Sequence, residues 1–121
     1  MSAAEATQRV EPEIRAVART ETGVAIDLVV PVDLVYFAGH FPGAPILPGV
    51  VQIAWAHRLA VRHLGAAEDL GSAARVKFKR AIGPGEALTL TLTPRADGAG
   101  FAFEYAGANG TRSVGSVGRS S

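Results

Sequence analysis

One segment with helical periodicity lies between regions whose apolar residues alternate. From residue 50 to about 64, steps of 100° place seven residues on one face: Val50, Ile53, Ala54, His57, Ala60, Val61 and Leu64. Gly65 then predicts the end of the helix. The other side still mixes apolar with polar residues: Val51, Trp55, Leu59, Gln52, Arg58, Arg62 and His63. An outer helix has a wider polar face, so we expect a central helix covered over most of its circumference.

Short strands are expected on both sides of this helix. Residues 13–19 and 23–30 precede it, and residues 24–30 show period-two patterning. After the helix, alternation returns at residues 76–79, 88–93 and 101–106, with turn signals at Asp97-Gly98 and Asn109-Gly110 and a weak final strand. This order predicts an α+β fold, a curved antiparallel sheet wrapped round one long central helix.

The chain has 121 residues, enough for one domain with a single core. Residues 1–12 are polar and alanine-rich, so we expect a loosely ordered segment there and one domain over 13–121. A formal charge of +1 gives no support for nucleic-acid or membrane-surface binding. Without cysteine or a zinc-ligand spacing, we expect neither a thiol nucleophile nor a metal site. No signal peptide or membrane-spanning run is evident, and we expect a cytoplasmic protein.

A loop rich in proline and glycine leads into the helix and contains His40. An imidazole titrates near neutral pH, so His40 is a candidate general base, although it can also simply hydrogen-bond within a tight loop. Gly49 and Val50 open the helix, where backbone N–H groups lack intrahelical partners and face the positive end of the dipole. Such groups can hold an oxygen on which negative charge develops. The plainer alternative is a helix start after Pro48.

Two stretches of the chain resemble the (3R)-hydroxyacyl-ACP dehydratases of bacterial fatty-acid synthesis, the FabZ/FabA type. The first is HFPG at residues 40–43 with PILPGV at 45–50, and the second is VKFKR at 76–80 with PGE at 84–86. The resemblance spans roughly residues 33–93. Tyr36-Phe37, Val51-Gln52 and Trp55 are most similar to the ApeI-like branch, dehydratases linked to aryl polyene synthesis.

This resemblance implies a hotdog fold and dimers with active sites at the subunit interface. His40 of one subunit would then act with a helix acid of the other. The implied substrate is a β-hydroxyacyl chain on the phosphopantetheine arm of an acyl carrier protein, and the implied cofactor is none. A homodimer or higher homo-oligomer is expected, or a heterodimer with an active paralogue.

The chain departs from the family at residue 54, where the family has Glu or Asp and this sequence has Ala54. Alanine cannot protonate a leaving hydroxyl, and losing a general acid costs on the order of 10² to 10⁴ in rate. His57, one turn later, is the obvious substitute, although a histidine bonded to a carbonyl is the commoner role. Asp33 is a more distant candidate and fits a cap or turn residue better.

Other residues are candidates for binding. Phe37, Phe41, Pro48 and Trp55, with Leu59 and the Ile46-Leu47 pair, are candidate walls of an acyl tunnel, although most such residues simply form core. Lys77, Lys79 and Arg80, with Arg58 and Arg62, are candidates for docking an acidic carrier protein, although alternating lysines are also typical of a solvated sheet face.

Three functions remain open. The leading hypothesis is a dehydratase-type hydro-lyase acting on carrier-protein thioesters. The second is a non-catalytic hotdog subunit that binds an acyl chain or pairs with an active partner, and Ala54 favours it. The third is a hotdog thioesterase, which also usually needs a carboxylate on the helix.

Overall fold

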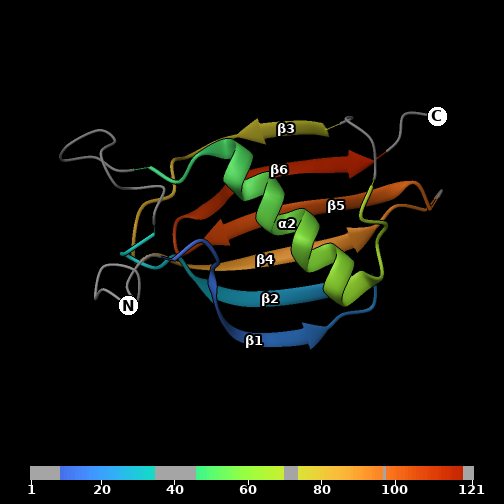
Figure 1. Cartoon of the computed structure of the whole chain (residues 1–121), viewed down its shortest axis with the longest axis horizontal. Coiled ribbons are helices and arrows are strands. Elements are labelled where there is room, and N and C mark those ends of the chain that lie inside the picture. Colours follow the sequence, from blue (N-terminus) through green and yellow to red (C-terminus); the bar gives the residue numbers. More distant parts are fainter. Residues whose placement is uncertain (1–8, 35–45, 70–73, 97, 119–121) are drawn as a thin grey trace, which may run out of the picture.

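The computed structural model describes residues 9–34, 46–69, 74–96 and 98–118. Six strands form one antiparallel sheet in the order β1-β2-β4-β5-β6-β3, and helix α2 lies across one face of it (Figure 1). The elements are β1 (Glu13–Arg19), β2 (Val24–Val29), α2 (Gly49–Leu64), β3 (Ala74–Phe78), β4 (Ala87–Pro94), β5 (Gly100–Gly107) and β6 (Gly110–Gly118). The expected α+β architecture is confirmed.

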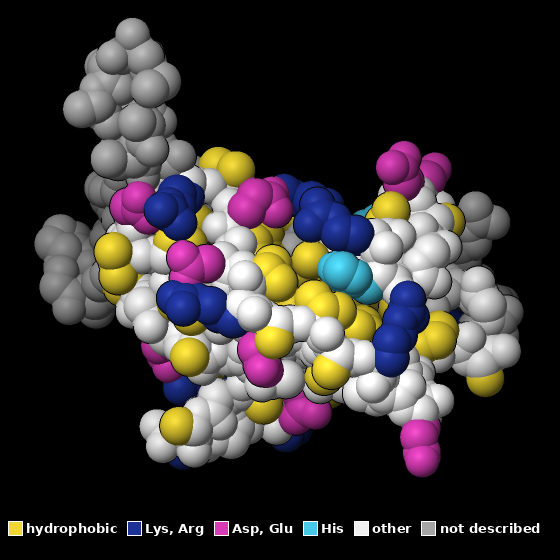
Figure 2. Space-filling model, turned by 90° about the horizontal axis from the view of Figure 1, so that it is seen from below, with side chains coloured by type: hydrophobic (Ala, Val, Ile, Leu, Met, Phe, Trp, Pro, Cys, Tyr) yellow, Lys and Arg dark blue, Asp and Glu magenta, His cyan; other side chains and the backbone are white. Residues whose placement is uncertain are grey.

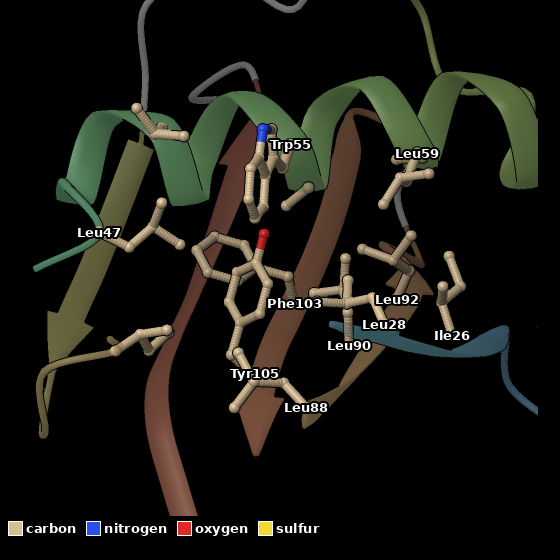
Figure 3. Packing of buried hydrophobic residues seen from close by; sticks show 14 of the residues in the cluster. Ile26, Leu28, Leu47, Trp55, Leu59, Leu88, Leu90, Leu92, Phe103 and Tyr105 are labelled. Atoms are coloured by element: carbon tan, nitrogen blue, oxygen red, sulfur yellow. The ribbon is translucent and has the colours of Figure 1, made fainter. Parts of the chain in front are cut away.

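The core fills the space between α2 and the middle of the sheet. Trp55 and Leu59 point from the helix toward the sheet, and Phe103 and Tyr105 of β5 rise to meet them (Figure 3). The alternation expected in β2, β4 and β5 places every second side chain in this core. These apolar residues are removed from water together, which is the main favourable term in folding.

The helix faces the sheet with a different side from its most apolar stripe. Its buried residues are Val51, Gln52, Trp55, Ala56, Leu59 and Ala60. Val50, which belongs to the apolar stripe, is 73% exposed, and Ile53, Ala54 and His57 are half-buried. Among the helix residues only Val50, Arg58 and Arg62 are exposed, so the helix is buried on the side facing the sheet and half-buried over most of the rest. The large apolar side chains of Trp55 and Leu59 determine which side of the helix is buried. Gln52 can be buried on the same side because its amide is hydrogen-bonded.

Both helix ends follow from local chemistry. Pro48 is the N-cap, in extended conformation with φ −61° and ψ 146°, and its fixed φ suits a helix start. Gly65 ends the helix in the left-handed conformation at φ 70°, and its N–H donates to the carbonyl of Ala60.

The chain before β1 crosses the middle of the helix. Trp55 Nε1 donates to the carbonyl oxygen of Val10 at 3.0 Å, and Glu11 pairs with Arg58. Within the segment expected to be loosely ordered, residues 9–12 thus make specific contacts, and residues 1–8 lie outside the described residues.

Strand β1 extends the sheet beyond the covered core. Val17 and Ile14 pair with the buried Ile26 and Leu28 of β2, yet they are 43% and 36% exposed. Viewed from the β1 edge of the sheet, hydrophobic side chains gather near the middle of the face, beside a histidine and basic residues (Figure 2).

Among the described residues, no helix is long and apolar enough to cross a membrane.

Candidate functional site

The start of α2 lies in a cleft of about 320 Å³. Gly49, Gln52 and Phe78 line it, together with Lys79 and Arg80 from the chain that follows β3. The N–H groups of Val51 and Gln52 both donate to the carbonyl of Pro48 at 3.1 Å. The N–H of Gly49 is one of the first N–H groups of the helix, for which an α-helix supplies no acceptor. This cleft therefore combines a helix N-terminus with two cations.

The aromatic ring of Phe78 packs directly against Gly49. A Cβ atom added at residue 49 would lie 2.5 Å from Phe78 Cζ, which is closer than real contacts allow. Because residue 49 is glycine, the aromatic ring can approach the backbone closely at this position. The ring is 52% exposed, so it borders the cleft rather than the core.

The segment before the helix is held from two sides. Leu47 N–H donates to the carbonyl of Ile82 at 2.7 Å, and Leu47 C=O accepts from Gln52 Nε2 at 3.1 Å. The helix start is consequently fixed both to the turn after β3 and to the helix itself.

A partly buried ion pair fixes the turn between β3 and β4. The guanidinium of Arg112, on β6, pairs with Glu86 and donates to the carbonyl of Ala81 at 2.9 Å. The carbonyl of Arg112 accepts from the N–H groups of Lys79 and Arg80 at 2.8 and 3.0 Å. Hydrogen bonding from Arg112 lowers the pKa of Glu86, and Glu86 raises that of Arg112. Lys79 and Arg80 therefore leave the sheet at a fixed position.

Arg112 and Gln52 contribute to the site, although no sequence pattern assigned either residue to it. Arg112 lies in a weak strand of small residues, 26 positions from Glu86. Gln52 was counted among the polar residues of the helix, and it is buried because Leu47 and Ser113 satisfy its amide. For Arg112 the available signal was one charged residue within a strand of small residues, and for Gln52 it was the similarity of Val51-Gln52 to the ApeI-like branch.

A second cleft, of about 620 Å³, runs along the outer side of α2 and contains the position of the missing acid. Ala54 and His57 both line it, with Arg58, Arg62 and Glu68. His57 Nε2 lies 2.9 Å from the carbonyl oxygen of Ala67, and its ring stacks on Phe101 with centroids 5.8 Å apart. In the neutral ring the proton therefore sits on Nε2, and a second proton would go to Nδ1.

The remaining predicted residues are distributed as follows. His40, Phe37 and Phe41 lie outside the described residues. Pro48 is the N-cap, and Trp55 is fully buried in the core, so a role in a tunnel wall stays a prediction. Lys77, Lys79 and Arg80 are exposed, as docking requires. Asp33 lies in a turn and pairs with Arg9 at 3.4 Å. The described chain contains no cluster of three His, Asp or Glu residues suited to a metal.

In the described part of the chain, one helix lies across an antiparallel six-stranded sheet, which defines a hotdog-fold protein. The sequence matches the ApeI-like family, described as ApeI dehydratase, over residues 16–117, and the chain belongs to this family. The FabZ 3-hydroxyacyl-[acyl-carrier-protein] dehydratase of Oenococcus oeni is 40% identical over 65 residues, covering 48% of this chain and 47% of the relative. The FabZ of Chloroflexus aggregans is 36% identical over 89 residues, covering 68% and 56%. The chain spans about half the length of the curated relatives it matches.

Solved structures agree with this fold. The dehydratase heterocomplex ApeI:P of Xenorhabdus doucetiae superimposes with a TM-score of 0.77 at 28% identity, covering 89% of this chain and 96% of the other. An uncharacterized protein of Erwinia carotovora superimposes with a TM-score of 0.76 at 33% identity, covering 88% and 94%. The chain is thus a hydroxyacyl-ACP dehydratase-like hotdog protein.

Proposed function

We propose that this protein eliminates water from a 3-hydroxyacyl thioester carried by an acyl carrier protein. The observation that carries the proposal is the helix N-terminus at Gly49, in a cleft bordered by Phe78, Lys79 and Arg80, within a chain of the ApeI-like family. A thioester oxygen is the kind of group that such an N-terminus stabilises when charge develops on it.

The chemistry divides between a base and an oxygen-binding site. His40 takes the proton from C2 of the substrate, and the charge that develops on the thioester oxygen is held by the N–H groups of Gly49 and Val50. The C2–C3 double bond forms as the bond from C3 to the hydroxyl breaks, and the hydroxyl leaves as water after taking up a proton. No electrons enter or leave overall, so the reaction requires no redox cofactor.

The proton for the leaving hydroxyl cannot come from Ala54. We assign it to His57, which lines the same outer cleft one helical turn later. Its contact with Ala67 leaves Nδ1 as the position that gains and loses the second proton. An imidazolium can donate directly or through one water molecule.

The site is completed by a second subunit. Within the described sheet, β3 is an edge strand that pairs with β6 alone, and Phe78 at its end is half exposed. At the start of α2, the apolar side chain of Val50 is 73% exposed among the described residues. A dimer would cover both features and would bring a second His40 loop to this protein's helix.

A second function has an observation in its favour. A chain with Ala54 can serve as a non-catalytic acyl-binding subunit, or as one half of a heterodimer whose other half supplies the acid. The structural similarity to a dehydratase heterocomplex supports this alternative, and the ApeI-like family supports a role in aryl-polyene-type or fatty-acid synthesis.

One experiment separates these functions. The purified protein, Ala54→Glu and His57→Ala are each incubated with 3-hydroxyacyl-ACP, and enoyl-ACP is followed by mass spectrometry. Turnover by the wild type that His57→Ala abolishes supports an enzyme with a relocated acid. Turnover by Ala54→Glu alone favours the non-catalytic subunit, and no turnover by any form contradicts dehydration of that substrate.

A further inference from the structure

One buried side-chain amide contributes to the attachment of the helix start described above to the rest of the protein. Gln52 is only 3% exposed, although glutamine is rarely buried. Its Nε2 donates to the carbonyl of Leu47 at 3.1 Å, and its Oε1 accepts from Ser113 Oγ at 2.8 Å. The side chain therefore connects the segment before the helix, the helix and strand β6.

The location of this connection matters more than its strength. Leu47 immediately precedes Pro48, Gly49 and Val50, and Gln52 itself forms part of the wall of the cleft at the helix N-terminus. Leu47 N–H is already fixed to Ile82, so the amide of Gln52 supplies the second attachment of this residue. A residue held through both its N–H and its C=O has little freedom to rotate. The N–H groups that follow it are therefore restricted as well.

We infer that Gln52 is a positioning residue for the oxygen-binding N–H groups of Gly49 and Val50. The inference rests on the proposed function, because it assigns Gln52 a part in the same site. Charge on the thioester oxygen develops only in the transition state, so misplaced N–H groups reduce kcat more than they raise KM. Displacement of a reacting group by about 1 Å can cost on the order of 10²-fold in rate.

The test replaces the amide without changing the length of the side chain. Gln52→Met removes both hydrogen bonds, and Gln52→Met combined with Ser113→Ala also removes the hydroxyl that loses its partner. Tyr105→Phe is the matched control, because Tyr105 is buried beneath the same helix and donates to the backbone carbonyl of Gln52 at 2.7 Å. That control leaves the contact between Gln52 and Leu47 intact.

Two readouts are needed. The first is kcat and KM for 3-hydroxyacyl-ACP, measured in the wild-type background or, where only Ala54→Glu turns over, in that background. The second is the backbone ¹⁵N order parameter of Gly49 and Val50, which requires no activity. We expect kcat to fall about 10- to 100-fold in both Gln52 variants with KM nearly unchanged. We also expect the order parameters to fall from about 0.85 toward 0.6, while Tyr105→Phe changes neither.

The opposite results would overturn the inference. Folded Gln52→Met with wild-type kcat, or an equal loss of kcat in Tyr105→Phe, shows that the amide only stabilises the fold. Unchanged order parameters at Gly49 and Val50 show that Leu47 holds the helix start without Gln52. Where neither background turns over, the proposed function fails, and the order parameters still decide whether Gln52 positions the helix start.

Discussion

Phe78 lies over Gly49 so closely that a methyl group at residue 49 would come within 2.5 Å of its Cζ atom. We predict that Gly49→Ala displaces this ring from the mouth of the cleft. Because Phe78 is half exposed and can move, the free energy of unfolding should change by no more than about 1 kcal/mol. Turnover should fall on the order of 10-fold, since the N–H groups lie beside the displaced ring.

A double-mutant cycle tests this relationship. Gly49→Ala should be better tolerated in a Phe78→Leu background, with a coupling energy of about 0.5 kcal/mol or more in the free energy of unfolding. Additive effects of the two substitutions would contradict the contact between residues 49 and 78.

His57→Gln separates proton donation from the hydrogen bond that His57 makes to Ala67. Glutamine can still donate to the carbonyl of Ala67 but cannot supply a proton as an imidazolium does. We expect turnover to fall on the order of 10² to 10⁴-fold. The loss of stacking on Phe101 should cost about 0.5–1.5 kcal/mol in thermal or denaturant unfolding. Unchanged turnover would limit His57 to a structural role.

Trp55→Phe should release the chain that crosses the helix. The substitution removes the hydrogen bond to Val10 and leaves a small cavity, so we expect a loss of about 1–3 kcal/mol in denaturant unfolding. Hydrogen exchange should accelerate at the backbone N–H groups of residues 9–11. Glu11→Gln is the control, because the pair with Arg58 is about half exposed and should contribute less than about 1 kcal/mol.

The ion pair between Glu86 and Arg112 predicts a pH dependence of stability. Hydrogen bonding from Arg112 lowers the pKa of Glu86 in the folded state, so the pair stabilises the protein above the unfolded-state pKa of about 4.3. That contribution is lost as the pH falls through the lower, folded-state pKa. In denaturant titrations, Glu86→Gln should be less stable than wild type at pH 7, and the difference should shrink below about pH 4. A constant difference would show that the charge of Glu86 is unimportant.

Carrier-protein docking predicts a dependence on charge and salt. Charge reversal at Lys77, Lys79 and Arg80 should raise KM for 3-hydroxyacyl-ACP, and the effect should weaken at higher ionic strength. The same thioester on free pantetheine should show little change. Arg19→Glu, at the end of β1 on the opposite edge of the sheet, is the matched control. Equal effects in this control would indicate a general influence of net charge.

Local patterns were sufficient for most elements of the fold. The predicted bounds of β1 agree with the structure, and the helix begins one residue earlier than predicted and ends where Gly65 indicated. Alternation in β4 and β5 and the glycine turn at Gly110 were also readable, because each depends on residues close together in the chain.

The same local patterns failed for the orientation of the helix. The stripe containing Ile53, Ala54 and His57 is the most apolar, yet the sheet covers the side that carries Trp55 and Gln52. Burial of Gln52 depends on Ser113, which is 61 residues away, and no periodicity reports such a partner.

The sequence by itself determined the helix, the alternating strands, the glycine at the helix start and the absence of a carboxylate at Ala54, since each of these is a property of neighbouring residues. Only the tertiary structure decided that Phe78 covers Gly49, that Arg112 holds the turn containing Glu86, and that His57 shares a cleft with Ala54. The first two contacts join residues 29 and 26 positions apart. Their formation depends on how the helix and sheet pack against each other, which no local pattern of residues specifies.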